Sequence, residues 1–215
     1  MNSRYLTAFA ILIALLVTGC STAPKTAGTG PQVAVMTIAF PKKKQKTETA
    51  RVVIQLDDRS APGAAENFRT LIARHYYDGM RFHRAFPHQL VQTGDPKSRE
   101  GVAVSVLQKV GLDIGDNARV GTGGPGYTLP PEIRLKLDKG AVAAARLPDS
   151  INPARLSNGS QFFVCISPMT QLNGQYTVFG HVTEGLDVLD AISASPTDSN
   201  DFPADPIIIR TIRME

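Results

Sequence analysis

The sequence contains no tryptophan and only two cysteines, Cys20 and Cys165. So few thiols exclude the disulfide framework that staples many small secreted domains. The four histidines lack the spacing of metal ligands, so we expect neither a metal site nor another cofactor. The net charge is only +4, and no dense Lys/Arg face with interleaved aromatic residues occurs, so nucleic acid is not an expected partner.

Long hydrophobic runs are also absent. The apolar run at residues 6–17 falls short of the roughly 20 residues that a membrane-spanning helix needs. Its length instead fits the apolar region of a signal peptide. The run ends in Val17-Thr18-Gly19-Cys20-Ser21, which resembles a bacterial lipobox and implies lipidation of Cys20 with cleavage before it. An ordinary secretory peptide or an uncleaved anchor is the alternative.

The expected organisation follows from this leader. Residues 1–19 are predicted to be a lipoprotein signal peptide, and residues 20–31, rich in Thr, Ala, Gly and Pro, a lipidated flexible tether. Residues 32–215 are predicted to form one domain. We expect a monomer in the bacterial cell envelope, held to the membrane through its lipid, with the outer membrane or periplasmic face favoured.

Strand-like and helical patterns alternate irregularly through the domain. The β-rich runs are 33–40, 51–56, 80–86, 89–92, 141–146, 161–166, 176–182 and 207–212. Apolar residues at helical spacing after Pro62 and between residues 185 and 192 predict two helices. About eight strands without βαβ alternation predict a mainly β fold: a closed eight-stranded antiparallel β-barrel capped by two α-helices.

Five short motifs follow one another along the domain. They lie in the segments 77–84, 92–95, 121–124, 159–163 and 172–180. The series includes Phe82-His83-Arg84 and Gly159-Ser160-Gln161-Phe162-Phe163, and it resembles the cyclophilin family of peptidyl-prolyl cis-trans isomerases. The resemblance covers about residues 32 to 214. It implies that the substrates are proline-containing polypeptides and that the reaction is rotation about an X-Pro bond.

The resemblance also implies roles for individual residues. Arg84 and Gln92 match the family's catalytic residues: a permanently charged guanidinium can donate to the proline nitrogen as the amide twists. The predicted substrate-binding residues are His83, Leu90, Ala145, Arg146, Gln161, Phe163, Leu172 and Tyr176. Among them, Phe163 and Leu172 match walls of a proline pocket, and Leu90 can replace the methionine that is usual there. Ala145 and Arg146 match the strand edge where the family pairs its backbone with the substrate.

Some positions depart from the family pattern. Gln89 stands where an aromatic wall of the proline pocket is usual, so proline binding should be weaker. Gln171 stands at the family's cyclosporin-contacting tryptophan, so we expect poor sensitivity to cyclosporin. Two insertions, within residues 96–120 and at residues 147–158, flank the site. The Gln89 departure motivates the main alternative, a proline-peptide binding module or holdase with little turnover; a structural lipoprotein on a borrowed fold is a further alternative.

Overall fold

The computed structural model describes residues 33–40, 48–99 and 120–215. The predicted signal peptide, the tether, Cys20 and most of the first insertion lie outside these ranges, so their predictions stay predictions. Within the described ranges, no helix is both long and apolar enough to cross a membrane.

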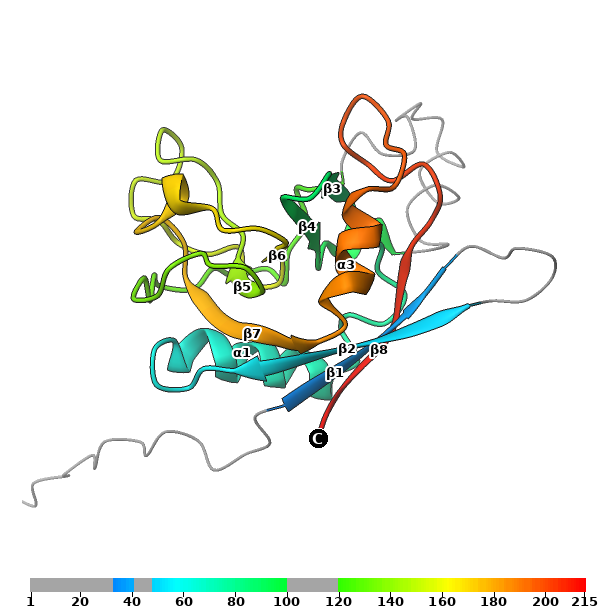
Figure 1. Ribbon diagram of the computed structural model, residues 1–215. Coiled ribbons are helices and arrows are strands. Elements are labelled where there is room, and N and C mark those ends of the chain that lie inside the picture. Colours follow the sequence, from blue (N-terminus) through cyan, green and yellow to red (C-terminus); the bar gives the residue numbers. More distant parts are fainter. Residues whose placement is uncertain (1–32, 41–47, 100–119) are drawn as a thin grey trace, which may run out of the picture.

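One antiparallel sheet of eight strands dominates the fold, in the order β3-β4-β6-β5-β7-β2-β1-β8. Within these described ranges, two α-helices, labelled α1 and α3, accompany it (Figure 1). The elements are β1 (Val33–Ala39), β2 (Thr49–Leu56), α1 (Pro62–Ala73), β3 (Arg84–Phe86), β4 (Leu90–Thr93), η1 (Pro96–Ser98), β5 (Ala141–Ala144), β6 (Phe162–Cys165), η2 (Thr170–Leu172), β7 (Val178–Glu184), α3 (Leu186–Ser193) and β8 (Ile208–Met214).

The predicted closure of the barrel is wrong, because the sheet is open and curled. Its two edge strands are β3 and β8, and they share no ladder. Within the described residues, the two ends are joined by an isolated bridge between Arg81 and Ile208 and by backbone hydrogen bonds of residues 79–82 to residues 207–209, at 2.8 to 3.0 Å. The physical reason is that the residues that reach β8, 79–82, precede β3 and form a single bridge there, while β3 itself, Arg84–Phe86, pairs with β4.

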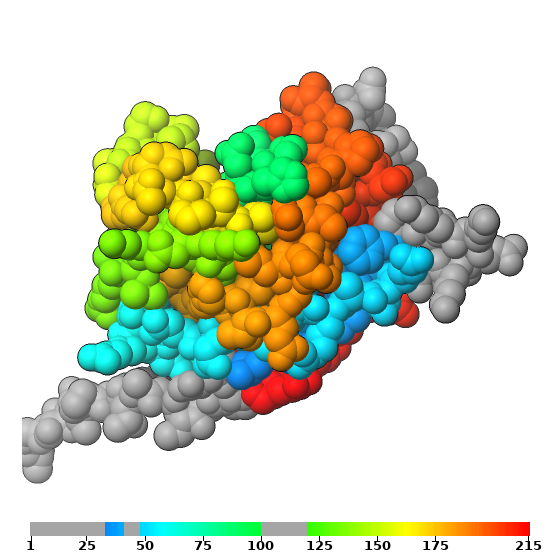
Figure 2. Space-filling model, in the orientation of Figure 1, coloured from blue at the N-terminus to red at the C-terminus, as the bar shows by residue number. Residues whose placement is uncertain are grey.

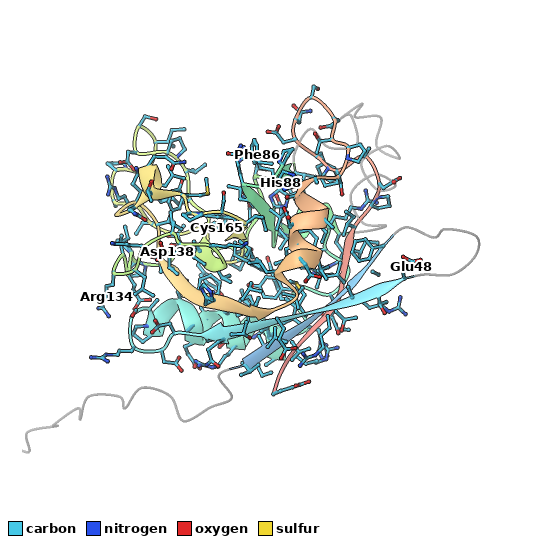
Figure 3. The ribbon with its side chains drawn as sticks, viewed as in Figure 1. Glu48, Phe86, His88, Arg134, Asp138 and Cys165 are labelled. Carbon is cyan, nitrogen blue, oxygen red and sulfur yellow. The ribbon has the colours of Figure 1, made fainter. Side chains whose placement is uncertain are left out.

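The helices contribute apolar faces to the main core. On α1, Phe68, Leu71 and Ile72 are buried at the expected i, i+3, i+4 spacing. The Glu132 carboxylate accepts hydrogen bonds from the Gly63 and Ala64 N–H groups at 3.1 and 2.9 Å, so a distant residue caps this helix. Helix α3 contacts β2, β3 and β4. His88 in the β3–β4 turn reaches Asp190 of α3 at 2.7 Å, and Figure 3 shows His88 and Phe86 beside that helix.

Strand β6 belongs to two hydrophobic cores at once. Because side chains alternate across a strand, Phe162 and Val164 face the main core while Phe163 and Cys165 face a second, smaller one. All four residues are buried. Leu90, Leu172 and Tyr176 pack against the second core, which therefore forms the floor beneath the candidate site.

Candidate functional site

Three of the predicted residues stand in one row across neighbouring strands. Arg84 on β3 is paired with Gln92 on β4, and Gln92 is paired with Phe163 on β6. Directly paired residues project from the same face of a sheet, so their side chains are neighbours. The fold thus brings a cation, an amide and an aromatic ring together.

A groove of about 620 Å³ runs over this row. It contains nine of the ten residues predicted for catalysis or substrate binding. They are Arg84, Leu90, Gln92, Ala145, Arg146, Gln161, Phe163, Leu172 and Tyr176. In Figure 2, the segments around residues 150 and 170, coloured yellow-green and yellow, project as a lobe beside the green β3–β4 segment.

A chain of amides anchors the polar end of the groove. Gln92 Nε2 donates to Gln161 Oε1 at 2.9 Å. Gln161 Nε2 in turn donates to the carbonyls of Gly121 and Gly123 at 3.0 and 2.8 Å. Gln161 is almost fully buried, with 3% of its surface exposed. Its polar atoms are satisfied, so this residue orients Gln92 and fixes the glycine-rich loop.

The glycine-rich loop is tied down by a buried carboxylate. Asp95 accepts hydrogen bonds from the N–H groups of Gly121, Gly123 and Lys97, the last at 2.7 Å. A Cβ atom on Gly123 would stand 2.1 Å from an Asp95 oxygen, so this position requires glycine. The Asn158 side chain also donates to the Gly123 carbonyl at 2.9 Å. The loop therefore forms a fixed wall of the groove.

The Arg84 guanidinium lies at the exposed edge of the groove. Its guanidinium lies over the Phe86 ring, 4.8 Å from the centroid, and 3.8 Å from Asp201 Oδ2. Its side chain is 45% exposed, so water screens the ion pair strongly. The guanidinium is therefore positioned by the ring and the carboxylate, yet it is accessible from the groove.

The apolar end of the groove is built on Phe163. Its ring meets the Tyr176 ring edge to face, with centroids 5.2 Å apart. Leu90 and Leu172 complete this end. Gln89 is absent from the groove lining: it is exposed in the β3–β4 turn, and its carbonyl accepts from the Ile166 N–H at 2.7 Å. The amide of Gln89 thus lies outside the apolar end.

His83 is the predicted site residue that the groove does not include. It is 2% exposed, and neither ring nitrogen has a hydrogen-bond partner among the described residues. Burial lowers the pKa of His83 to about 4, against the opposing effect of the nearby Asp95 carboxylate. The ring is therefore neutral at physiological pH and occupies a core position.

Ala145 and Arg146 are already engaged within the chain. The Ala145 N–H donates to the Gln161 carbonyl at 2.9 Å, and the Ala145 carbonyl accepts from the Asn158 N–H at 2.8 Å. The Arg146 guanidinium lies 4.9 Å from the Tyr176 ring centroid and donates to the Gln175 carbonyl at 2.7 Å. Backbone pairing at Ala145 is thus satisfied internally, and Arg146 supports the groove wall.

Sequence reasoning missed several residues at this site. Asp201 approaches Arg84 from a loop more than a hundred residues away, and nothing in its local sequence signals that contact. Leu147 and Ile151 line the groove from the second insertion. Their signal was available: they are large apolar residues within an otherwise polar, proline-containing loop.

The described ranges offer neither a cluster of metal ligands nor a reactive thiol. No group of three or more His, Cys, Asp or Glu side chains there could hold a metal ion. Burial raises the pKa of the Cys165 thiol to about 12, so this thiol is not a nucleophile at neutral pH. Figure 3 shows Cys165 in the interior.

Comparison with solved structures defines the class of fold. A cyclophilin type peptidyl-prolyl cis-trans isomerase from Cryptosporidium parvum superposes with a TM-score of 0.63 at 27% sequence identity, covering 84% of this chain and 98% of that one. The same protein crystallised in the presence of the dipeptide Ala-Pro gives a TM-score of 0.61.

Sequence comparison then identifies the family. The family model "Cyclophilin type peptidyl-prolyl cis-trans isomerase/CLD" matches residues 44–214. Peptidyl-prolyl cis-trans isomerase ppi1 of Schizosaccharomyces pombe is 31% identical, covering 79% of this chain and 96% of the relative. Human peptidyl-prolyl cis-trans isomerase-like 1 is 30% identical, covering 76% and 86%. The chain therefore belongs to the cyclophilin-type peptidyl-prolyl cis-trans isomerases, enzymes that catalyse rotation about X-Pro bonds.

These relatives correct one prediction from the sequence. The predicted location in a bacterial cell envelope is wrong on this comparison, because the similar proteins are fungal and mammalian isomerases. The family match likewise gives no support to a lipid anchor. The prediction rested on the apolar run at residues 6–17 and on Val17 to Ser21, which precede the matched region and so carry no information on the family.

Proposed function

We propose that Arg84 accelerates X-Pro rotation by donating a hydrogen bond to the proline nitrogen in the twisted transition state. The observation that carries this role is the row formed by Arg84, Gln92 and Phe163 across three neighbouring strands of one groove. Rotation must break amide resonance, at a barrier of about 18–20 kcal/mol. As the nitrogen becomes pyramidal it gains a lone pair, so a donor aimed at it stabilises the transition state more than the planar ground state.

The other groove residues position the substrate. Phe163, Leu90 and Leu172 receive the proline ring and exclude water from the amide, which favours the less polar twisted state. Gln92, held by Gln161, orients the substrate carbonyl on the residue before proline. The proposed isomerase domain comprises residues 32–215, and one chain suffices because it supplies all of these side chains.

The role of Arg84 is tested with a peptide isomerisation assay on Arg84→Ala and Arg84→Lys. A charge-assisted hydrogen bond contributes about 1.5–3 kcal/mol, so Arg84→Ala should lower kcat/KM by roughly 10- to 100-fold. Lysine keeps the charge but loses the guanidinium fork, so it should recover only part of the loss. Arg210→Ala, at an exposed position of β8, is the matched control and should be neutral.

Two results would contradict the proposal. If Arg84→Ala retains the full wild-type rate, the guanidinium has no role in the transition state. If the wild-type protein binds proline peptides without accelerating their isomerisation, the groove belongs to a binding module instead.

A further inference from the structure

Two large apolar side chains lie open to water on the loop of residues 147–156, here named the rim loop. Leu147 is 57% exposed and Ile151 is 67% exposed, the highest values among the exposed large hydrophobic residues in the described part of the chain. Both line the groove that contains Arg84 and Phe163. Single exposed apolar residues are ordinary, but a pair on the wall of a binding groove indicates a contact surface.

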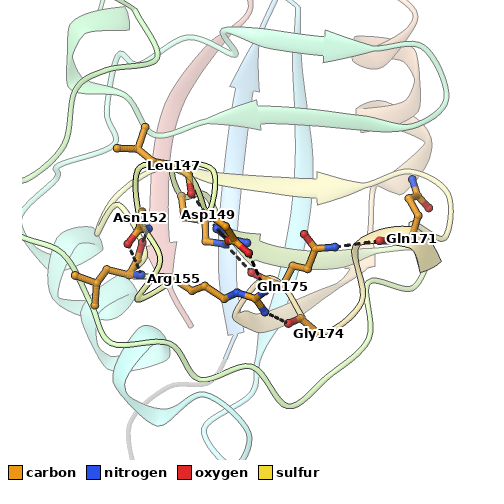
Figure 4. A network of polar contacts seen from close by, with 9 residues as sticks. Leu147, Asp149, Asn152, Arg155, Gln171, Gly174 and Gln175 are labelled. Atoms are coloured by element: carbon orange, nitrogen blue, oxygen red, sulfur yellow. Dashed lines mark hydrogen bonds and ion pairs between the residues drawn. The ribbon is translucent and has the colours of Figure 1, made fainter.

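The rim loop is held in place by charged and polar contacts. Asp149 accepts hydrogen bonds from Arg146 at 2.6 Å and from Arg155 at 2.8 Å. The Asn152 side chain donates to the Leu156 carbonyl at 2.8 Å and accepts from the Leu156 N–H at 3.1 Å. Figure 4 shows this network closing the loop on itself. Leu147 and Ile151 are thus presented on a loop of fixed shape.

The same network joins the rim loop to the proline end of the groove. Arg155 donates to the Gly174 carbonyl at 2.8 Å, and Figure 4 shows Gly174 and Gln175 beside the loop. The Arg146 guanidinium lies over Tyr176, whose ring contacts Phe163. The groove is therefore one continuous surface from Phe163 to Ile151. A substrate seated by its proline therefore has this surface beside the residues that flank the proline.

We propose that Leu147 and Ile151 form an apolar subsite that takes a large aliphatic or aromatic side chain near the substrate's proline. The occupant is the substrate polypeptide itself, because the subsite shares its groove with the residues that receive the X-Pro bond. The inference rests on the proposed function. It assigns the enzyme a preference for X-Pro bonds in hydrophobic segments, and the rigid loop makes the contact without an ordering cost.

The test compares matched peptides with the full-length protein. Each peptide carries one X-Pro bond and either leucine or serine at one of the three positions on each side of it. Contact that removes about 50 Å² of apolar surface from water corresponds to roughly tenfold in affinity. At one position at least, the wild-type enzyme should therefore show a leucine-to-serine ratio of kcat/KM near ten.

If the two side chains contribute equally, Leu147→Ser and Ile151→Ser should each reduce that ratio to about three, and the double variant should bring it to about one. Leu135→Ser is the control, since Leu135 is also exposed, at 37%, but lies outside this groove. It should keep the wild-type ratio. Circular dichroism of each variant checks that the fold persists.

Three outcomes separate the two proposals. A wild-type ratio near one at every position, or a ratio that survives in the double variant, overturns the subsite. If Arg84→Ala is inactive while the ratio is near one, the role of Arg84 stands and the subsite fails. If the ratio behaves as expected but Arg84→Ala is fully active, the subsite stands and the role of Arg84 fails.

Discussion

Replacing Gln161 by leucine tests the amide chain that supports the groove. Leucine approximates the volume of glutamine, so the change removes hydrogen bonds without opening a large cavity. Three bonds disappear: the one accepted from Gln92 and the two donated to the Gly121 and Gly123 carbonyls. At about 1 kcal/mol each, their loss should cost about 3 kcal/mol of unfolding free energy.

The expected loss is large enough to measure. For a domain of this size, about 1 kcal/mol shifts Tm by roughly 2–4 °C, so Gln161→Leu should lower Tm by about 6–12 °C. Activity should fall as well, because Gln92 loses the partner that fixes its side chain. Immobilising one such side chain is worth about 0.5–1.5 kcal/mol, which corresponds to a fall in kcat/KM of about two- to tenfold.

Calorimetry measures the change in Tm of Gln161→Leu, and the isomerisation assay measures its change in kcat/KM. Gln175→Leu is the matched control, because it removes one exposed hydrogen bond, from Gln175 Nε2 to the Gln171 carbonyl at 3.1 Å. The control should lower Tm by less than about 2 °C, since such a bond contributes about 0.5 kcal/mol. If Gln161→Leu and Gln175→Leu lowered Tm equally, the buried hydrogen bonds of Gln161 would stabilise the fold no more than one exposed bond, and the reasoning would be refuted.

Three further predictions concern pH, backbone and the proline end. The pKa of His83 is lowered to about 4, so between pH 6.5 and 4 its imidazole is protonated in the unfolded chain but stays neutral in the folded chain. This residue should therefore remove about 3 kcal/mol of stability as pH falls through that window; urea titrations of wild type and His83→Phe should diverge there, and parallel curves would count against it. Gly94 has φ +88°, and a Cβ there would stand 2.3 Å from the Ser160 carbonyl oxygen. Gly94→Ala should therefore cost at least about 3 kcal/mol. Gly126→Ala, at φ +90° in open space, should cost about 1 kcal/mol, and equal losses in thermal melts would show that backbone strain alone decides. Because Gln89 lies outside the groove, Gln89→Phe and Gln89→Ala should both keep kcat/KM within about twofold of the wild-type value; a rise of about tenfold in Gln89→Phe would show that position 89 does reach the substrate.

The sequence predicted the elements well and their closure badly. Alternating apolar residues and the helical spacing of Phe68, Leu71 and Ile72 are local signals, and both kinds of element formed where expected. Whether β3 and β8 pair is decided by how many residues at each edge keep strand geometry. Local propensity does not report this, because residues 79–82 read as part of the strand yet form a single bridge to β8, while Arg84–Phe86 pair with β4.

For the candidate site, too, the sequence predicted some features and missed others. Nine predicted residues share the groove, because motif order carries the sheet register that brings them together. Side-chain engagement could not be predicted. Arg146 is bound by Asp149 of the inserted loop and by Tyr176, and the Ala145 backbone is bound by Gln161 and by Asn158 at the end of that loop. The burial of His83 was also hidden, since the neighbouring Arg84 in the same motif is exposed.

The position of β6 between two cores has a consequence for folding. Phe162 is locked into the main core and its neighbour Phe163 forms the floor of the groove, so one cannot be ordered without the other. The groove consequently cannot assemble as an independent unit early in folding. Recovered isomerase activity in a refolding experiment should follow the global transition, with no active intermediate before it. Isomerase activity would thus be a measure of the fraction of chains that have completed folding.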